Sequence, residues 1–295
     1  MAQYSIKDIE NLSGIKAHTL RIWEQRYDLF KPHRTDTNIR YYTDNDLKLI
    51  LNVVLLSKQG YRIGAIAKMS EEEIRSNVYS LSQTDLKYEV HINELTQAMV
   101  DIDEEVFEKT IATCILQYGL TKTMLNIIYP FLVKIGYMWV TDGINPAQEH
   151  FITNLIRQKI IVAIDGQVAK YNEHSKHYLL FLPEGELHEI SLLFLAYLLK
   201  SRNHRITYLG MSVPLKDVAE TVAIKTPDSL YTIFTSSPSD ENLHEYIQAL
   251  SDSFAGKTIY ISGIKLMAYN QTPPPNICFL HSLDEVMKHF NLSHD

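Results

Sequence analysis

The sequence predicts a multidomain α and α/β chain: a winged helix-turn-helix, then a four-helix bundle, then a Rossmann-like, doubly wound parallel sheet. Two short amphipathic segments flank a Ser-Gly turn near the start, which is the spacing of a helix-turn-helix. A long central stretch is poor in Pro and Gly and helical in its apolar pattern. Beyond it, short apolar runs alternate regularly with helical segments. These observations place the three domains at 1–75, 76–170 and 175–295.

The first element is a short helix over residues 5–12. Ser5 can cap it, with Asp8 three residues later, and Gly14 follows as a turn residue. A second helix is expected from about 16 to 27. Trp23 falls on its inward face and is expected in the core.

A small hairpin, or wing, is expected within residues 31–42. The segment 35–38 reads Thr-Asp-Thr-Asn, which favours a turn, and its flanks are basic or β-favouring. Thr43 or Asp44 then caps a helix that ends near Lys58, and a further short helix covers 62–68.

The remaining elements follow from the same two periodicities. The central stretch predicts four helices with short connections, near 89–100, 103–118, 121–139 and 147–168. The last part predicts strands at 178–182, 206–209, 230–234, 258–261 and 277–280, with helices at 188–201, 215–224, 242–250 and from 282 onward.

Composition excludes several classes of protein. The chain has 295 residues, of which 45% are apolar and 21% charged, so it is neither collagen-like nor disordered. Two cysteines cannot staple a chain of this size and fit a reducing compartment. The first residues form no apolar signal core, and the run from Ile190 to Leu199 is too short to span a bilayer. We therefore expect a cytoplasmic protein without a membrane partner.

The charge is unevenly distributed. The whole chain carries −7, but residues 1–68 hold 11 Lys and Arg against 7 Asp and Glu, which gives +4. The remainder holds 17 against 28, which gives −11. A basic head on an acidic body favours a DNA-contacting module joined to a part that does not contact DNA, although ordinary fluctuation could also produce it.

Residues 4–69 resemble the DNA-binding domain of the MerR family of transcription regulators. The resemblance rests on Tyr4-Ser5-Ile6, Ile9, Gly14, Thr19-Leu20-Arg21-Ile22-Trp23-Glu24, Arg40-Tyr41-Tyr42, Asp46-Leu47 and Gly60-Tyr61-Arg62-Ile63. It implies a winged helix-turn-helix that dimerises on near-palindromic, double-stranded promoter DNA. A homodimer is therefore expected, and a tetramer is possible.

The expected DNA contacts fall into two classes. Outward residues of the second helix can reach base edges in the major groove, and basic or aromatic residues of the wing can bind phosphates. The candidates for base contacts are His18, Arg21 and Gln25, and those for phosphates are Arg34, Arg40 and Tyr41.

Two further constellations carry chemistry. Trp139 is followed ten positions later by Glu149-His150, and Glu186-Leu187-His188 lies between an expected strand and helix. A histidine at the carboxyl end of a sheet strand lies where such sheets bind cofactors. Its imidazole can ligate a metal while an acid two residues earlier orients the other ring nitrogen. A surface loop histidine is the competing interpretation.

Residues 76–295 resemble the helical-bundle plus Rossmann-like unit that binds cobalamin in methionine synthase and related proteins. That unit's loop reads Asp/Glu-x-His-x-x-Gly, which Glu186 and His188 match. The complete domain order resembles the light-sensing, adenosylcobalamin-dependent repressors of the MerR family, which share the spacing of Trp139, Glu149 and His150.

The resemblance implies cobalamin as cofactor, with adenosylcobalamin the expected form and His188 the lower cobalt ligand. Trp139 would pack on the adenosyl group, with Glu149 and His150 nearby. The other cofactor-binding positions are Ser191, which is glycine in the family's loop motif, Thr235 and Ser236, in the family's Ser-x-Leu/Thr region, and Ser262 and Gly263, in place of its Gly-Gly.

The sequence thus predicts a DNA-binding transcription regulator that senses a cobalamin, with a possible light response, and not an enzyme. Ser191 in place of the motif glycine keeps one alternative open: a regulator whose degenerate cobalamin domain senses another ligand or a protein partner. A corrinoid carrier or methyltransferase fragment is a lesser alternative, since neither has a use for a winged helix-turn-helix.

Overall fold

A computed structural model describes residues 4–35, 38–58, 60–80, 87–140 and 144–292. The chain divides into two compact units, 1–155 and 156–295, and the division falls within one long helix. Among the described residues, no helix combines the length and apolar character needed to cross a bilayer.

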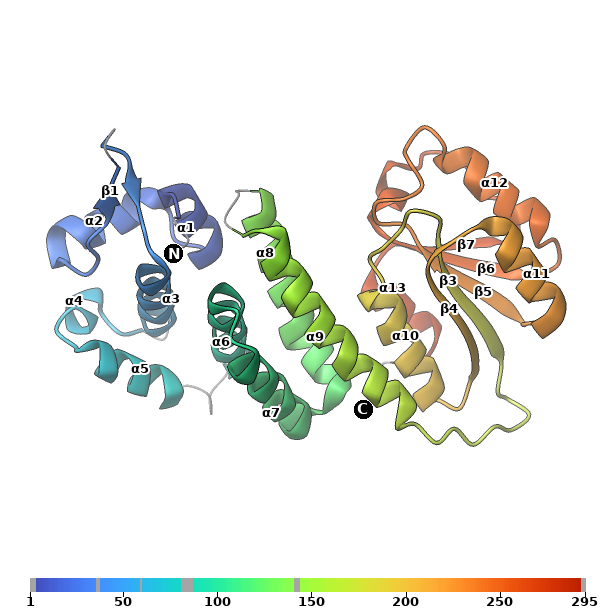
Figure 1. Cartoon of the computed structure of the whole chain (residues 1–295), viewed down its shortest axis with the longest axis horizontal. Coiled ribbons are helices and arrows are strands. Elements are labelled where there is room, and N and C mark those ends of the chain that lie inside the picture. Colours follow the sequence, from blue (N-terminus) through green and yellow to red (C-terminus); the bar gives the residue numbers. More distant parts are fainter. Residues whose placement is uncertain (1–3, 36–37, 59, 81–86, 141–143, 293–295) are drawn as a thin grey trace. The chain divides into compact units, whose positions relative to one another are not determined.

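The first unit begins with a helix-turn-helix and a two-stranded wing (Figure 1). Ser5 and Asp8 form a reciprocal capping box at the start of the first helix, and Gly14 ends it with a φ of 72°. Thr43 caps the helix after the wing by accepting from the Asp46 N–H at 3.4 Å. The wing's expected turn includes residues 36–37, which lie outside the described residues. The elements are α1 (Ile6–Ser13), α2 (Ala17–Tyr27), β1 (His33–Arg34), β2 (Arg40–Tyr41), α3 (Asp44–Lys58) and α4 (Ile63–Ile66).

Helix α5 (Glu71–Ser80) was not among the expected elements. The signal for it was present in the sequence as a capping box, Ser70 with Glu73. The Glu73 N–H donates to the Ser70 hydroxyl at 3.2 Å, and the Ser70 N–H donates to the Glu73 carboxylate at 2.7 Å. Three glutamates in its first turn also suit the positive end of the helix dipole.

The four central helices occur close to their expected positions. Gly119 takes non-helical angles at the expected break, but helical hydrogen bonding resumes at once, so the chain kinks rather than stops. The elements are α6 (Lys87–Asp101), α7 (Glu104–Thr123), the π-helical turn η2 (Met124–Ile128), α8 (Tyr129–Val140) and α9 (Pro146–Asp165).

The second unit is a five-stranded, fully parallel sheet of order β4-β3-β5-β6-β7. The first strand of this sheet therefore lies between the second and the third, which is the flavodoxin-like variant of the doubly wound fold. The strands are β3 (His177–Pro183), β4 (Arg205–Val213), β5 (Ser229–Ile233), β6 (Thr258–Ser262) and β7 (Ile277–Leu280). The helical segments are α10 (Ile190–Ser201), α11 (Leu215–Lys225), α12 (Leu243–Ser253), the 3-10 turn η3 (Ile264–Ala268) and α13 (Leu283–His289).

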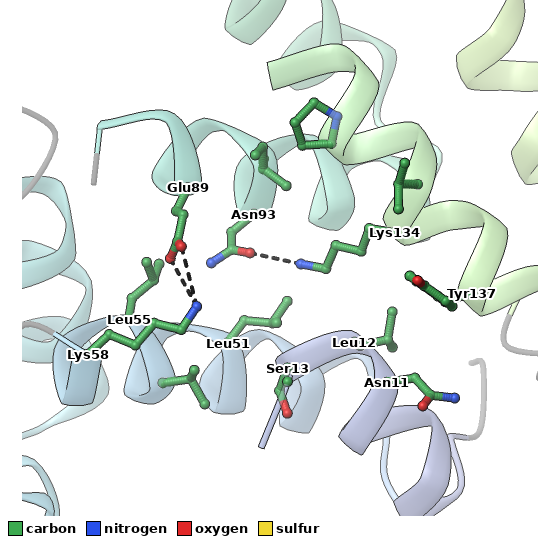
Figure 2. Close-up of a pocket in the computed structure, with 15 residues that line it drawn as sticks. Asn11, Leu12, Ser13, Leu51, Leu55, Lys58, Glu89, Asn93, Lys134 and Tyr137 are labelled. Atoms are coloured by element: carbon green, nitrogen blue, oxygen red, sulfur yellow. Dashed lines mark hydrogen bonds and ion pairs between the residues drawn. The ribbon is translucent and has the colours of Figure 1, made fainter. Parts of the chain in front are cut away.

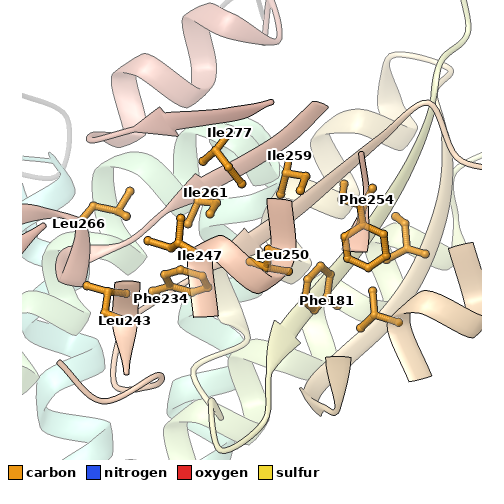
Figure 3. Close-up of a cluster of buried hydrophobic side chains, with 13 residues drawn as sticks. Phe181, Phe234, Leu243, Ile247, Leu250, Phe254, Ile259, Ile261, Leu266 and Ile277 are labelled. Atoms are coloured by element: carbon orange, nitrogen blue, oxygen red, sulfur yellow. The ribbon is translucent and has the colours of Figure 1, made fainter. Parts of the chain in front are cut away.

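Helices cover both faces of the sheet, as doubly wound folds require. Residues of α11 and α12 pack with alternate strand residues in one buried apolar cluster, shown in Figure 3 around Phe181, Phe234 and Ile247. On the other face, the Phe290 ring at the end of α13 packs edge-on against Tyr178, with the ring centroids 5.5 Å apart. Because side chains alternate along each strand, these two layers use different residues of the same strands.

Candidate functional site

Helix α2 presents a polar surface of the kind expected at DNA. His18, Arg21 and Gln25 are all exposed on it, whereas Trp23 is only 7% exposed and packs near Phe30, as predicted for a core residue. The residue whose side chain caps the start of this helix was not expected from the sequence. Glu10 of α1 accepts from the Ala17 N–H at 2.9 Å and from the Lys16 ammonium at 2.9 Å. This carboxylate joins α1 to α2, so it fixes the angle at which α2 is presented.

The wing pairs His33 with Tyr41 and Arg34 with Arg40 in antiparallel register. Arg34 is exposed and donates to the Asn38 side chain at 2.6 Å. Tyr41 is half-buried, and its ring stacks on His33. Of the three expected phosphate-binding residues, Arg34 is therefore exposed, whereas Arg40 and Tyr41 are half-buried.

Arg40 has a second environment that the sequence did not reveal. Its Nε lies 3.7 Å from a carboxylate oxygen of Glu24, which is only 9% exposed on α2. The Tyr42 hydroxyl donates to the same carboxylate, and burial together with Glu24 raises the pKa of Tyr42. Glu24 therefore ties the wing to α2, in addition to any role of Arg40 at phosphates.

The candidate cofactor site lies at the topological switch point of the sheet. Strands β3 and β5 are neighbours, yet the chain leaves them toward opposite faces, and such a point opens a crevice at the carboxyl ends of the strands. The two loops that meet there are 184–189 after β3 and 234–242 after β5. Glu186 and His188 belong to the first loop, and Thr235 and Ser236 belong to the second.

Glu186 is the residue that joins these loops. It is fully buried, and its Oε2 accepts from the N–H groups of Thr235, Ser236 and Ser237 at 2.8, 2.6 and 3.0 Å. Its Oε1 accepts from the His188 N–H at 3.1 Å and lies 2.6 Å from the His188 Nδ1. Burial by itself would raise the pKa of Glu186, but the hydrogen bonds from His188, Ser237 and Ser236 outweigh it and hold that pKa far below its usual value.

An ionised Glu186 fixes the protonation pattern of the histidine. A carboxylate only accepts hydrogen bonds, so the His188 Nδ1 carries a proton, and in the neutral imidazole Nε2 is the ring nitrogen that presents a lone pair. The side chain of His188 is 57% exposed, so this nitrogen is accessible at the sheet edge. A carboxylate that orients an imidazole is the usual support of a histidine metal ligand.

The side chains around His188 limit which metal groups could bind there. Within the described residues, no cluster of three or more His, Cys, Asp or Glu side chains could enclose a metal ion. A metal bound at His188 would therefore have to bring most of its ligands with it, as the cobalt of a corrin ring does. The residues present fit a cobalamin with His188 on cobalt.

The three positions at which the family has glycine lie in different environments. Ser191 is half-buried in the first turn of α10. The Ser262 hydroxyl lies 2.7 Å from the Tyr231 hydroxyl in the buried part of the sheet. Gly263 has a φ of 115°, and a Cβ there would lie 2.2 Å from the Phe234 carbonyl oxygen, so only glycine fits. The end of β6 thus presses against the start of the loop that binds Glu186.

Trp139, Glu149 and His150 belong to the first unit. Trp139 lies near the end of α8 with 46% of its surface exposed, and Glu149 and His150 lie in the first turn of α9, half-buried and exposed respectively. His188 belongs to the second unit, so the combination of these residues into one site stays a prediction.

Glu189 is a further residue whose role the sequence did not indicate. It is 6% exposed, forms an ion pair with Arg157, and accepts from the Tyr208 hydroxyl at 3.1 Å. Burial, followed by the charge of Glu189, raises the pKa of Tyr208. The pair fixes the backbone directly after His188, where α10 begins.

Two family models match the chain, and both matches end before the sheet that carries His188. Residues 4–73 match the MerR HTH family regulatory proteins, and residues 91–163 match the B12 binding domain. The chain combines a MerR-type DNA-binding domain with a B12-binding domain. The MerR-type domain spans α1 to α4 and the wing, and the B12-binding domain covers most of α6 to α9.

Two curated relatives are similar to this chain over most of its length. The sequence is 24% identical over 268 residues to the HTH-type transcriptional repressor CarH of Myxococcus xanthus, with 88% of each chain covered. It is 25% identical over 260 residues to the repressor CarA of the same organism, with 84% of this chain and 81% of CarA covered. A solved Methanosarcina barkeri monomethylamine corrinoid protein is 13% identical, with a TM-score of 0.44, and the match covers 58% of this chain and 82% of that one.

Proposed function

We propose that this protein is a transcription regulator that binds promoter DNA and senses adenosylcobalamin, with His188 as the lower cobalt ligand. The observation that carries the proposal is the Glu186–His188 pair, which joins two loops at the switch point and presents Nε2 at the sheet edge. The matches to a MerR-type domain and to a B12 binding domain support the two halves of this function.

The chain's own residues have separate tasks. His18, Arg21 and Gln25 read base edges, while Arg34, Arg40 and Tyr41 bind phosphates as a homodimer engages its operator. Glu186 keeps His188 in the tautomer that can bind cobalt, and Trp139, Glu149 and His150 contact the upper ligand. A bound adenosylcobalamin supplies a cobalt–carbon bond that light can break.

The protein acts by binding rather than by catalysis, as expected from its similarity to two repressors. The second candidate is a regulator that senses another ligand or a protein partner without cobalamin. Ser191 favours this candidate, because it places a half-buried side chain where the motif has glycine.

The deciding experiment is purification of the full chain with adenosylcobalamin in darkness, followed by visible absorption spectroscopy. We expect the wild type and the control His174→Ala, an exposed histidine elsewhere on the same unit, to retain the corrinoid with the same spectrum. His188→Ala should lose the corrinoid or shift its spectrum. Absence of uptake by the wild type would favour the second candidate, and an unchanged spectrum in His188→Ala would remove the ligand assignment.

A further inference from the structure

A pocket lies in the first unit, and none of the residues that line it is among the DNA-binding or cofactor-binding candidates named above. It is a partly open pocket with a volume of about 310 Å³, lined by residues of α1, α3, α6 and α8 (Figure 2). Its size is at the lower end of pockets that hold small organic molecules. Ser13 and Gly14 line it, and they connect α1 to the DNA-facing helix α2.

The walls combine apolar surface with a small set of polar groups. Leucines of α1 and α3, including Leu12 and Leu51, form much of the lining. Lys58 and Lys134 reach the cavity from α3 and α8, and Glu89 reaches it from α6. Both oxygens of Glu89 lie 3.3 Å from the Lys58 ammonium, so one of the two lysine charges is compensated.

Lys134 is not compensated in this way. Its ammonium donates to the amide oxygen of Asn93 at 3.0 Å, a neutral acceptor, and in the part of the chain that the structure describes no carboxylate pairs with it. Burial, and then the positive charge of Lys58, lower the pKa of Lys134 to about 8, while Glu89 opposes this. A desolvated cation without a counterion is costly, and an anion beside it would offset that cost.

We propose that this cavity binds a small organic carboxylate, whose carboxylate pairs with Lys134 and whose apolar body packs on the leucines. A cationic ligand would face two ammonium groups. A neutral apolar ligand would leave the half-buried charge of Lys134 without a counterion. An inorganic phosphate would leave the apolar walls without a partner. The site would give a metabolite access to the helix-turn-helix through Ser13 and Gly14, independently of cobalamin.

The test uses the full chain, with hexanoate as the probe and hexanamide as its neutral match, followed by isothermal titration calorimetry. We expect hexanoate to bind the wild type and the surface control Lys109→Met equally, and hexanamide to bind at least about tenfold more weakly. Lys134→Met should lose hexanoate binding by at least about tenfold. Glu89→Gln should tighten it, because the substitution removes the nearby negative charge.

Titration gives a readout that does not depend on any variant. The charged groups facing the ammonium of Lys134 are Lys58 and Glu89, with the Tyr137 hydroxyl on its own helix. Above about pH 8 the Lys134 ammonium loses its proton, so hexanoate affinity should fall by about tenfold per pH unit. The proposal would be overturned if hexanamide bound as tightly as hexanoate, if Lys134→Met bound hexanoate as the wild type does, or if hexanoate affinity were constant from pH 7 to 10. It would also be overturned if Glu89→Gln showed no saturable hexanoate binding.

Discussion

Replacement of Glu186 by glutamine separates the structural role of this residue from its effect on His188. The change keeps the size of the side chain and replaces one acceptor oxygen by an NH₂ donor. Three fixed N–H groups, those of Thr235, Ser236 and Ser237, face Oε2. Oε1 faces one fixed N–H, that of His188, and the Ser236 hydroxyl, which can rotate to accept instead of donate. We therefore expect the amide to keep its oxygen toward the loop after β5 and to turn its NH₂ toward His188.

The expected magnitude follows from that orientation. The His188 backbone N–H then meets a donor, and an unsatisfied donor costs about 1–3 kcal/mol of the free energy of unfolding. The imidazole must also accept from the new NH₂ group, so Nδ1 loses its proton and Nε2 gains it. A protonated Nε2 cannot ligate a metal, so Glu186→Gln should abolish the cobalt ligand although His188 is still present.

Urea unfolding and corrinoid absorption measure the two effects. The matched control is Glu184→Gln, the same change in charge at an exposed position in the same loop. The control should match the wild type in both measurements, whereas Glu186→Gln should be less stable and should take up corrinoid as His188→Ala does. A Glu186→Gln protein with wild-type stability and a wild-type corrinoid spectrum would refute the reasoning on both the hydrogen bonds and the tautomer.

Three more outcomes are expected. The pKa of Glu186 is lower in the folded than in the unfolded protein, so Glu186 stabilises the fold fully above the unfolded-state pKa of 4.5 and progressively less below it. The difference in unfolding free energy between wild type and Glu186→Gln should therefore shrink as the pH falls below 4.5. Gly263→Ala should lower the free energy of unfolding by at least about 2 kcal/mol more than Gly256→Ala does. Both glycines have a positive φ, but only at Gly263 would the added Cβ clash with backbone atoms, so equal melting temperatures of the two variants would contradict this. Arg21→Ala should weaken operator binding by about 1–3 kcal/mol in fluorescence anisotropy, with Lys109→Ala unchanged, and equal affinities would argue against a base contact.

Local chemistry made much of the fold predictable. The Ser5 and Thr43 caps, the glycine after α1 and the strict alternation of the sheet region each act over a few residues, so they could be read from the chain. The capping box of Ser70 and Glu73 is an equally local signal, and it marks the start of α5, which was not among the expected helices. The π-helical turn after Gly119 was not predictable in this way, because packing around a kinked helix decides where hydrogen bonding resumes.

The candidate sites were predictable in their residue types but not in their connections. The motif names Glu186 and His188, yet the three N–H groups that hold Glu186 come from about fifty residues later in the sequence. The pairing of Arg40 with Glu24 and of Glu189 with Arg157 likewise depends on tertiary contacts. No local pattern marks such partners, since each residue by itself resembles an ordinary surface charge.

The two parts of the proposed cobalamin site make different demands on the protein. The orientation of His188 is fixed within the second unit by Glu186, so it does not depend on the first unit. Trp139 belongs to the first unit, so a ligand that contacts both residues favours one mutual arrangement of the units. A ligand shifts such an equilibrium only by the difference in its affinity for the two arrangements. Retention of the ligand should therefore depend on His188, while the change in DNA binding should depend on Trp139, and the two properties should be separable by mutation.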